Sequence, residues 1–214
     1  VSAMASFQPE VAKGTALRTG DAAAVLLCQT NTHAIFRVIG WGEYAPHGNY
    51  YRLCCLKGGM ETNHRNGQMR LCYNQFSRPD GIDDCIKEYP IEWQNQSLGE
   101  IAQNAGHGGG DFMSVYEFVK CLENGTEPYF NVYRSTTLAS VAILAWRSIL
   151  NNNTAYDVPD FRNEKDRRRY EFDTISPYPD EKFQVDIPCS SLPYHPTAAD
   201  LENAHRLWEE HDCL

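Results

Sequence analysis

The sequence predicts an α+β fold, with an open, predominantly antiparallel β-sheet, helices packed on one face, and an irregular, proline-rich C-terminal tail. Three observations support this prediction. Residues 1–75 contain short apolar stretches separated by turn residues, residues 111–150 show apolar side chains at helical spacing, and five prolines follow between positions 177 and 196. Strands joined by short turns pair antiparallel, and a change of period marks the passage from strands to helices.

Each strand of the predicted sheet is bounded by turn residues. Residues 22–29 form a continuous apolar run, which is typical of a strand buried on both faces. Asn31-Thr32 would turn the chain into a second strand over residues 33–41, making an antiparallel hairpin. Further strands are expected over residues 50–56, 60–62 and 68–73. Asn66-Gly67 favours a type I′ turn before the last of these strands.

Two helices are predicted after a polar, irregular stretch over residues 76–106. In the first, apolar side chains recur at helical spacing over residues 112–122, and Asn124-Gly125 ends the helix. Asp111 suits its start, both as a cap and as a negative charge at the positive end of the helix dipole. The second helix is expected over residues 135–150, where many Ala and Ser residues indicate close packing against another element.

We expect two regions along the chain. Residues 1–161 would form the α+β domain, and residues 162–214 a C-terminal extension that wraps over the surface and includes a short helix at 201–211. Lys165-Asp-Arg-Arg-Arg169 is a charge run typical of a solvated face. The chain opens as a strand and without an initiator methionine, so the domain is expected to be incomplete at its N-terminus.

Composition argues against nucleic acid and membranes as partners. The net charge of −9 would repel a phosphate surface. No stretch reaches the roughly 18 consecutive apolar residues of a membrane helix, and no signal peptide is recognisable at the N-terminus.

Eight cysteines bear on the location of the protein. None forms a Cys-x-x-Cys pair, so a structural zinc site is not expected and no metal ligand is assigned. Most of the cysteines lie within apolar strand or helix patterns, where a thiol behaves as a small hydrophobic group. We therefore expect buried, reduced cysteines and a cytoplasmic protein.

Six stretches of the sequence follow one another in a distinctive order, and together they resemble one protein family. They are Gly20-Asp-Ala-Ala-Ala-Val-Leu-Leu, residues 38–53, Leu56-Lys-Gly-Gly-Met-Glu-Thr, Gly106-His-Gly-Gly-Gly-Asp-Phe, Tyr129-Phe-Asn-Val-Tyr133 and Asp157-Val-Pro-Asp-Phe161. Together they resemble the C-terminal domain of the glucose–fructose oxidoreductase/inositol dehydrogenase family, Gfo/Idh/MocA. The branch with His-Gly-Gly-x-Asp-Phe also includes NAD-dependent α-N-acetylgalactosaminidase-like glycosidases.

The resemblance implies a partner domain and a cofactor. Family members join an N-terminal Rossmann domain, which binds NAD(P), to a C-terminal domain that shapes the sugar site and often forms the oligomer interface. This chain holds no Gly-x-Gly-x-x-Gly after a strand, no Glu-Lys-Pro, and no Asp-x-x-x-His in the right context. We therefore assign no catalytic residue and expect no cofactor bound by this chain alone, with NAD or NADP in the intact protein and a homo-oligomer formed through the sheet face.

Three residues are candidates for contact with a sugar. Glycines around His107 would let the imidazole approach a sugar hydroxyl beside free N–H donors, unless they form only a tight loop in which His107 hydrogen-bonds locally. His47 would lie at the pocket rim, at a subunit contact, or simply in a polar loop. Tyr50 would stack on a sugar ring or belong to a core or interface.

Two further polar residues, Arg52 and Asp111, and the adjacent cysteines Cys54 and Cys55 could also have a functional role. Arg52 either pairs with a carboxylate such as Glu43 or lies exposed on an open face, and Asp111 is interpreted as a helix cap rather than a catalytic acid. Cys54-Cys55 lies in a strand without an adjacent base, so a cysteine nucleophile is not expected.

Two functions are consistent with these residues. In the first, the chain is the substrate-binding and oligomerisation domain of an NAD(P)-dependent oxidoreductase acting on a sugar or cyclitol, or part of an NAD-dependent glycosidase of the same family. In the second, it is a non-catalytic assembly or sugar-binding domain, because an open sheet with an apolar outer face tends to associate face to face.

Overall fold

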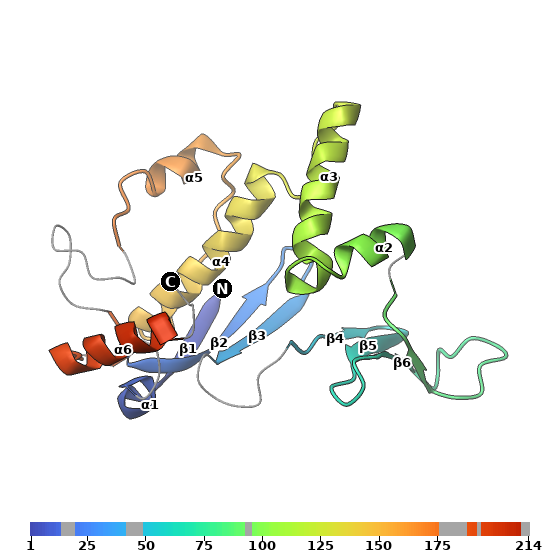
Figure 1. Ribbon diagram of the computed structural model, residues 1–214, viewed down its shortest axis with the longest axis horizontal. Coiled ribbons are helices and arrows are strands. Elements are labelled where there is room, and N and C mark those ends of the chain that lie inside the picture. Colours follow the sequence, from blue (N-terminus) through green and yellow to red (C-terminus); the bar gives the residue numbers. More distant parts are fainter. Residues whose placement is uncertain (14–19, 42–48, 93–95, 176–187, 192–193, 211–214) are drawn as a thin grey trace. The chain divides into compact units, whose positions relative to one another are not determined.

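The computed structural model describes residues 1–13, 20–41, 49–92, 96–175, 188–191 and 194–210 (Figure 1). The chain divides into two compact units, one formed by Val1–Ala45 with Tyr129–Leu214 and the other by Pro46–Pro128. Within the described ranges there are two antiparallel sheets and six α-helices, which confirms the predicted α+β class with open sheets. The strands form two sheets rather than one, with three in the first unit and four in the second.

The sheet of the first unit has the strand order β1-β2-β3 (Figure 1). Its strands are β1 (Ser2–Phe7), β2 (Asp21–Gln29) and β3 (Ile35–Trp41). The predicted hairpin at Asn31-Thr32 is confirmed, with Gln29 opposite Ile35 and a hydrogen bond of 2.9 Å from the Thr30 N–H to the Ala34 carbonyl. The prediction that β2 is buried on both faces is wrong. Val25 and Leu27 are exposed, because an antiparallel sheet need be covered on one face only.

Helix α4 (Val132–Leu150) packs on β1 and forms the core of this unit. Ala3, Ala145 and Ile149 are buried together, so small side chains let the helix and strand approach closely. The Ser148 hydroxyl accepts a hydrogen bond of 2.9 Å from the backbone N–H of Ala3. Close packing by the Ala and Ser residues of α4 is therefore confirmed.

The start of α4 lies three residues before its predicted position. The Asn131 side chain accepts a hydrogen bond from the Arg134 N–H, so Asn131 is the N-cap.

At the other end, the extended segment after α4 holds the N-terminus. The Val1 ammonium donates to the Tyr156 carbonyl at 2.6 Å, and the Tyr156 N–H donates to the Val1 carbonyl at 2.8 Å.

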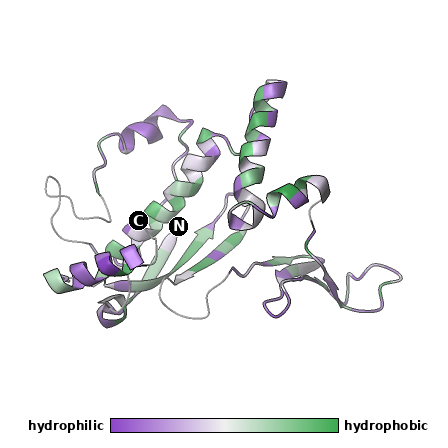
Figure 2. Cartoon of the chain, viewed as in Figure 1, coloured by the Kyte–Doolittle hydropathy of each residue, from purple (hydrophilic) through white to green (hydrophobic). Residues whose placement is uncertain are grey.

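Three short helices complete the described part of this unit. They are α1 (Pro9–Lys13), α5 (Glu164–Arg169) and α6 (Ala198–Glu210). Helix α5 holds the predicted charge run, has no buried residue and is hydrophilic along its length in Figure 2. Between α5 and α6, Cys189 is buried and the Ser190 N–H donates to Asp21 at 2.7 Å. The boundary predicted at residue 161, between the α+β domain and the C-terminal extension, stays a prediction. No described helix is long and apolar enough to cross a membrane.

The second unit contains a four-stranded sheet and two α-helices. In sheet order the strands are β4 (Arg52–Cys55), β5 (Gly58–Thr62), β6 (Met69–Tyr73) and β7 (Ile86–Tyr89), and the helical segments are α2 (Gln96–Ala102), the 3₁₀ turn η1 (His107–Gly109) and α3 (Gly110–Asn124). Strand β7 and helix α2 lie in the stretch that was expected to be irregular. Each is short, with four and seven residues, so neither shows a clear hydrophobic period.

The turn between β5 and β6 differs from the predicted type I′ turn. That turn requires positive φ at both central residues, whereas only Gly67, with φ of 69°, has it. The Asn66 side chain instead accepts a hydrogen bond from the Gln68 N–H at 3.0 Å. A longer loop results, closed by a bond of 2.7 Å from the Asn63 N–H to the Gln68 carbonyl.

Apolar side chains of the second unit are less buried than expected. Helix α3 ends at the left-handed Gly125 as predicted, yet it has no buried residue, and Val115 and Leu122 are exposed. Cys54 and Cys55 are exposed as well, which corrects the prediction of buried cysteines, because no helix described in this unit covers β4. The seven cysteines in the described ranges are all free thiols.

Replacing Ser148 with Ala should lower the free energy of unfolding by about 1–3 kcal/mol, because the buried Ala3 N–H loses its acceptor. Urea unfolding followed by circular dichroism measures the change. Ser140→Ala is the matched control, since the Ser140 hydroxyl donates only to the Thr136 carbonyl of its own helix. An equal loss in both variants would contradict the role of Ser148.

Candidate functional site

The glycine run that precedes α3 forms a tight left-handed loop. His107, Gly108 and Gly109 have φ of 53°, 63° and 94°, and the Gly109 N–H donates to the Gly106 carbonyl at 3.1 Å. Glycine adopts these angles without penalty, whereas a side-chain-bearing residue such as histidine is disfavoured there by roughly 1–2 kcal/mol. His107 is therefore held in a conformation that its own backbone does not favour.

The loop brings the His107 ring onto the carboxylate of Asp111. The Nδ1 atom lies 3.0 Å from both carboxylate oxygens, while the two side chains stay 86% and 61% exposed. A Cβ on Gly106 would overlap with this carboxylate, so a larger residue at position 106 would require the Asp111 side chain to move. An exposed contact of this kind contributes little to stability, no more than about 0.5 kcal/mol even where the imidazole is charged. It does not offset the backbone penalty, so stability alone does not explain the arrangement.

The predicted capping role of Asp111 is wrong. Gly109 occupies the N-cap position of α3, and no side chain makes a capping hydrogen bond there. The carboxylate bonds the His107 ring instead, although its charge still lies in the first turn, where the helix dipole favours it. Helical spacing does not explain this contact, because His107 lies in the left-handed turn before α3 and not on the helix itself.

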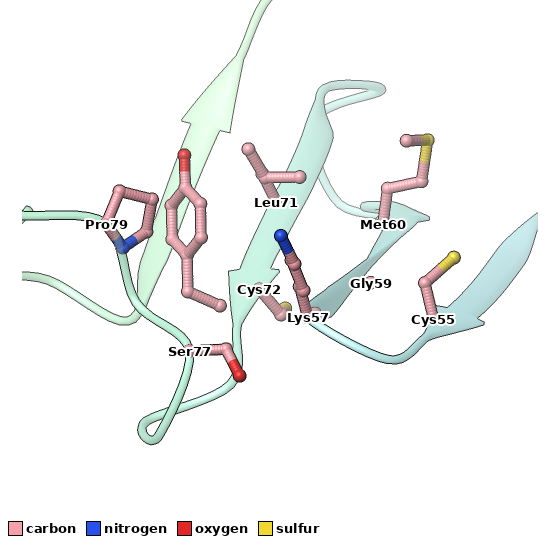
Figure 3. Close-up of a pocket in the computed structure, with 10 residues that line it drawn as sticks. Cys55, Lys57, Gly59, Met60, Leu71, Cys72, Ser77 and Pro79 are labelled. Atoms are coloured by element: carbon pink, nitrogen blue, oxygen red, sulfur yellow. The ribbon is translucent and has the colours of Figure 1, made fainter.

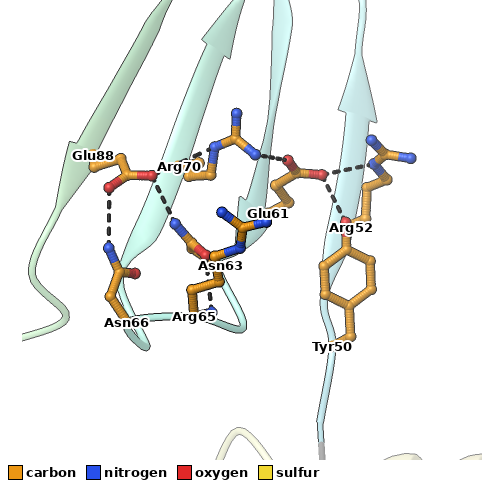
Figure 4. A network of polar contacts seen from close by, with 8 residues as sticks. All are labelled: Tyr50, Arg52, Glu61, Asn63, Arg65, Asn66, Arg70 and Glu88. Carbon is orange, nitrogen blue, oxygen red and sulfur yellow. Dashed lines mark hydrogen bonds and ion pairs between the residues drawn. The ribbon is translucent and has the colours of Figure 1, made fainter.

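Tyr50 belongs to a separate polar network on the sheet of the same unit (Figure 4). Its hydroxyl donates to Glu61 at 2.7 Å, and Glu61 also accepts from Arg52 Nε at 2.9 Å. Arg70 donates to the other oxygen of Glu61 at 3.0 Å. Arg52 is thus paired with its direct cross-strand neighbour, while the alternative partner Glu43 lies outside the described residues.

A second carboxylate, Glu88, extends the network across β7. It accepts hydrogen bonds from the side-chain amides of Asn63 at 2.7 Å and Asn66 at 3.1 Å, and Arg70 Nε lies 3.6 Å away. The Tyr50 ring also stacks on His64, with ring centroids 4.7 Å apart. Tyr50 is therefore neither core nor free, because its hydroxyl and one ring face already have partners.

The polar groups of this network shift the pKa values of one another. The hydrogen bond from Tyr50 is the largest cause that lowers the pKa of Glu61; desolvation opposes it, and the positive charges of Arg52 and Arg70 lower the pKa further. The same hydrogen bond raises the pKa of Tyr50, and the neighbouring negative groups raise the pKa of Arg52. Glu61 therefore stays ionised and is bonded by three donors, so it is poorly suited to accept a proton from a substrate.

The predicted sugar-contact residues are not brought together. Tyr50 interacts with Glu61 and His64, His107 interacts with Asp111, and no interaction between Tyr50 and His107 is found in the described part of the unit. His47 lies outside the described residues. Of the two that the structure describes, only His107 has a polar atom, Nε2, that is exposed and not engaged by the protein.

A shallow cavity of about 290 Å³ lies on the four-stranded sheet (Figure 3). It is lined by Cys55, Lys57, Gly58, Gly59, Met60, Leu71, Cys72, Tyr73, Ser77 and Pro79. The lining is mostly apolar and includes none of the predicted site residues. Because side chains alternate along a strand, Met60 projects from the face opposite to Glu61 and the polar network. This hollow lacks the convergent hydrogen-bonding groups that a sugar needs.

The glycine run before α3 does not fit the pyrophosphate of a dinucleotide. The glycine run follows α2 and a turn rather than a strand, and Asp111 places a carboxylate where a pyrophosphate would bind at the start of α3. No group of three or more His, Cys, Asp or Glu side chains lies close enough to hold a metal, as far as the structure describes the chain.

Comparisons with known proteins point to one family. The model of the glycosyl hydrolase 109 C-terminal domain matches residues 20–167. A glycosyl hydrolase family 109 protein of Solibacter usitatus is 33% identical over 79 residues, which are 36% of this chain and 17% of that protein. An alpha-N-acetylgalactosaminidase of Shewanella oneidensis is 36% identical over 75 residues, 35% of this chain and 16% of that protein. The match thus spans about a sixth of these relatives, and no solved structure matches the chain.

Replacing Tyr50 with Phe should raise the pKa of Glu61 toward its ordinary value, because the Tyr50 hydrogen bond is the largest cause of its lowering. A carboxyl carbon NMR titration measures this change. In the wild type the network stabilises the folded state at neutral pH, and that stability is lost as the pH falls through the lowered pKa. Tyr89→Phe is the control, since Tyr89 lies on the opposite face and should leave Glu61 unchanged.

Proposed function

This chain belongs to the family of glycosyl hydrolase 109 C-terminal domains, and on that premise we propose that it forms the sugar-binding part of a glycosidase acting on α-linked N-acetylgalactosamine. Among the proteins with Gfo/Idh/MocA-like C-terminal domains, the family match favours the branch of glycosidases. The name of the Shewanella oneidensis relative supports this substrate. A sugar oxidoreductase, which the sequence favoured, stays the alternative, and product analysis of the intact protein separates the two.

The exposed ring and the left-handed backbone of His107 are the observation that supports the proposal. The matched segment contains the glycine loop, which holds an exposed imidazole in a conformation that histidine does not favour. Strained backbone of this kind is concentrated at functional sites. The imidazole offers a ligand one free nitrogen, which suits a hydrogen bond to a sugar hydroxyl.

The cofactor and its domain are parts of the same proposal. The glycine run does not fit a dinucleotide, which supports the proposal that NAD or NADP is held by a Rossmann domain elsewhere in the intact protein. The part played by this chain is then to bind and orient the sugar. His47 and Tyr50 remain proposed contacts at the pocket rim, with Tyr50 restricted by its bonds to Glu61 and His64. A cytoplasmic location, with free thiols, belongs to the proposal too.

An assembly role is a second candidate, supported by the outer face of the first sheet. The register places five apolar side chains on the face away from α4, and these are between 39% and 71% exposed. They are Met4, Val25, Leu27, Ile35 and Ile39. An exposed apolar patch of this kind is typical of an interface between proteins. We propose that two copies of the chain associate through this face.

Replacing His107 with Ala should weaken the binding of N-acetylgalactosamine roughly two- to tenfold, the effect of losing one hydrogen bond. Titration calorimetry or NMR shift changes in the full chain measure the affinity. His33→Ala is the control, because His33 is also an exposed histidine with positive φ but lies in the other unit. Unchanged affinity in the His107 variant would remove this residue from the sugar site.

Replacing Val25 with Glu should shift the chain from dimer to monomer, because a charge between Met4 and Ile39 on the central strand of the apolar face prevents its burial. Sedimentation velocity of the 214-residue chain measures the state. Leu56→Glu controls for added charge, since Leu56 is exposed in the turn before β5, within the other unit. A wild-type chain that sediments as a monomer at high concentration would contradict this assembly role.

A further inference from the structure

The contact between His107 and Asp111 fixes both the position of the imidazole ring and the ring nitrogen that carries its hydrogen. A carboxylate only accepts hydrogen bonds, and both of its oxygens lie 3.0 Å from Nδ1. A neutral imidazole carries its single hydrogen on one of two nitrogens. Since Nδ1 faces only acceptor atoms, the hydrogen belongs on Nδ1, and Nε2 is left with a lone pair.

The surrounding loop maintains this arrangement. Gly106 leaves room for the carboxylate in its present position, which a Cβ at residue 106 would displace, and the left-handed turn from His107 to Gly109 directs the ring back over Asp111. Asp111 is fixed in turn because it belongs to the first turn of α3, a helix of fifteen residues. The pair therefore combines a rigid acceptor with a ring whose far edge faces solvent.

We propose that Asp111 is a positioning residue, which holds His107 in the Nδ1–H tautomer so that Nε2 accepts a hydrogen bond from a sugar hydroxyl. This inference rests on the proposed function and narrows the ligand. The group that binds at Nε2 must be a donor, such as a free hydroxyl. A sugar with fluorine or a methyl ether in place of that hydroxyl lacks the donor and loses the contact.

The tautomer can be measured without any ligand. In the ¹⁵N-labelled full chain at about pH 8, where an ordinary imidazole is neutral, long-range ¹H–¹⁵N spectra distinguish a protonated from an unprotonated ring nitrogen. We expect Nδ1 of His107 to be protonated and Nε2 to be free in the wild type. Hydrogen on Nε2 in the wild type would overturn the proposal, whatever the variants do.

Asp111→Ala removes the acceptor and should abolish the preference for Nδ1–H, so that both tautomers exchange. Glu117→Ala is the matched control, because it removes the same charge from an exposed position of α3 and should leave the His107 signals unchanged. Circular dichroism verifies that the helix persists in both variants. Retention of the Nδ1–H tautomer in a folded Asp111→Ala variant would also overturn the proposal.

Sugar binding separates this inference from the proposed function. Asp111→Ala should weaken N-acetylgalactosamine binding roughly two- to tenfold, and analogues that lack one hydroxyl donor should identify the hydroxyl that bonds Nε2. If the wild type shows the Nδ1–H tautomer but no sugar binds, the proposed function fails and the binding half of the inference fails with it. If sugar binds equally well to the wild type and to Asp111→Ala, the inference alone is overturned.

Discussion

The contact between helix α4 and strand β1 organises the larger of the two units. Ala3 and Ala145 keep the two elements close, and Ser148 satisfies the N–H of Ala3, which an edge strand would otherwise leave unpaired. The bonds between Val1 and Tyr156 hold the strand beside the end of the helix. Helix α4 packs on one face of β1, and the apolar face on the other side of the sheet is the one proposed for assembly.

The second unit depends on local polar contacts rather than on a comparable core. Its sheet is linked by Glu61 and Glu88, which join neighbouring strands through arginine and asparagine side chains. Its helix α3 has no buried residue. In such a unit the position of a functional side chain is set by nearby hydrogen bonds, as Asp111 sets the ring of His107.

The two polar sites therefore differ in what they offer a ligand. Glu61 is bonded by three donors and its pKa is lowered, so the network around Tyr50 stabilises the sheet. His107 has one partner and one free nitrogen, in a left-handed turn that it shares with Gly108 and Gly109. The backbone penalty at His107 exceeds what an exposed contact with Asp111 contributes to stability, and this supports the ligand-binding role proposed for His107.

Features that depend on near neighbours along the chain could be predicted from the sequence: the hairpin at Asn31-Thr32, the end of α3 at Gly125 and the apolar period of that helix. The sequence motifs also indicated the wider Gfo/Idh/MocA-like group to which the family belongs. The partner of Arg52, the contact of Asp111, the exposure of Cys54 and the division of the strands into two sheets became clear only from the structure. Capping and turn signals act within a few residues, so they can be read locally. Register and burial depend on which distant segments meet, as Arg52 meets Glu61 and Ala3 meets Ser148, and no local pattern specifies that.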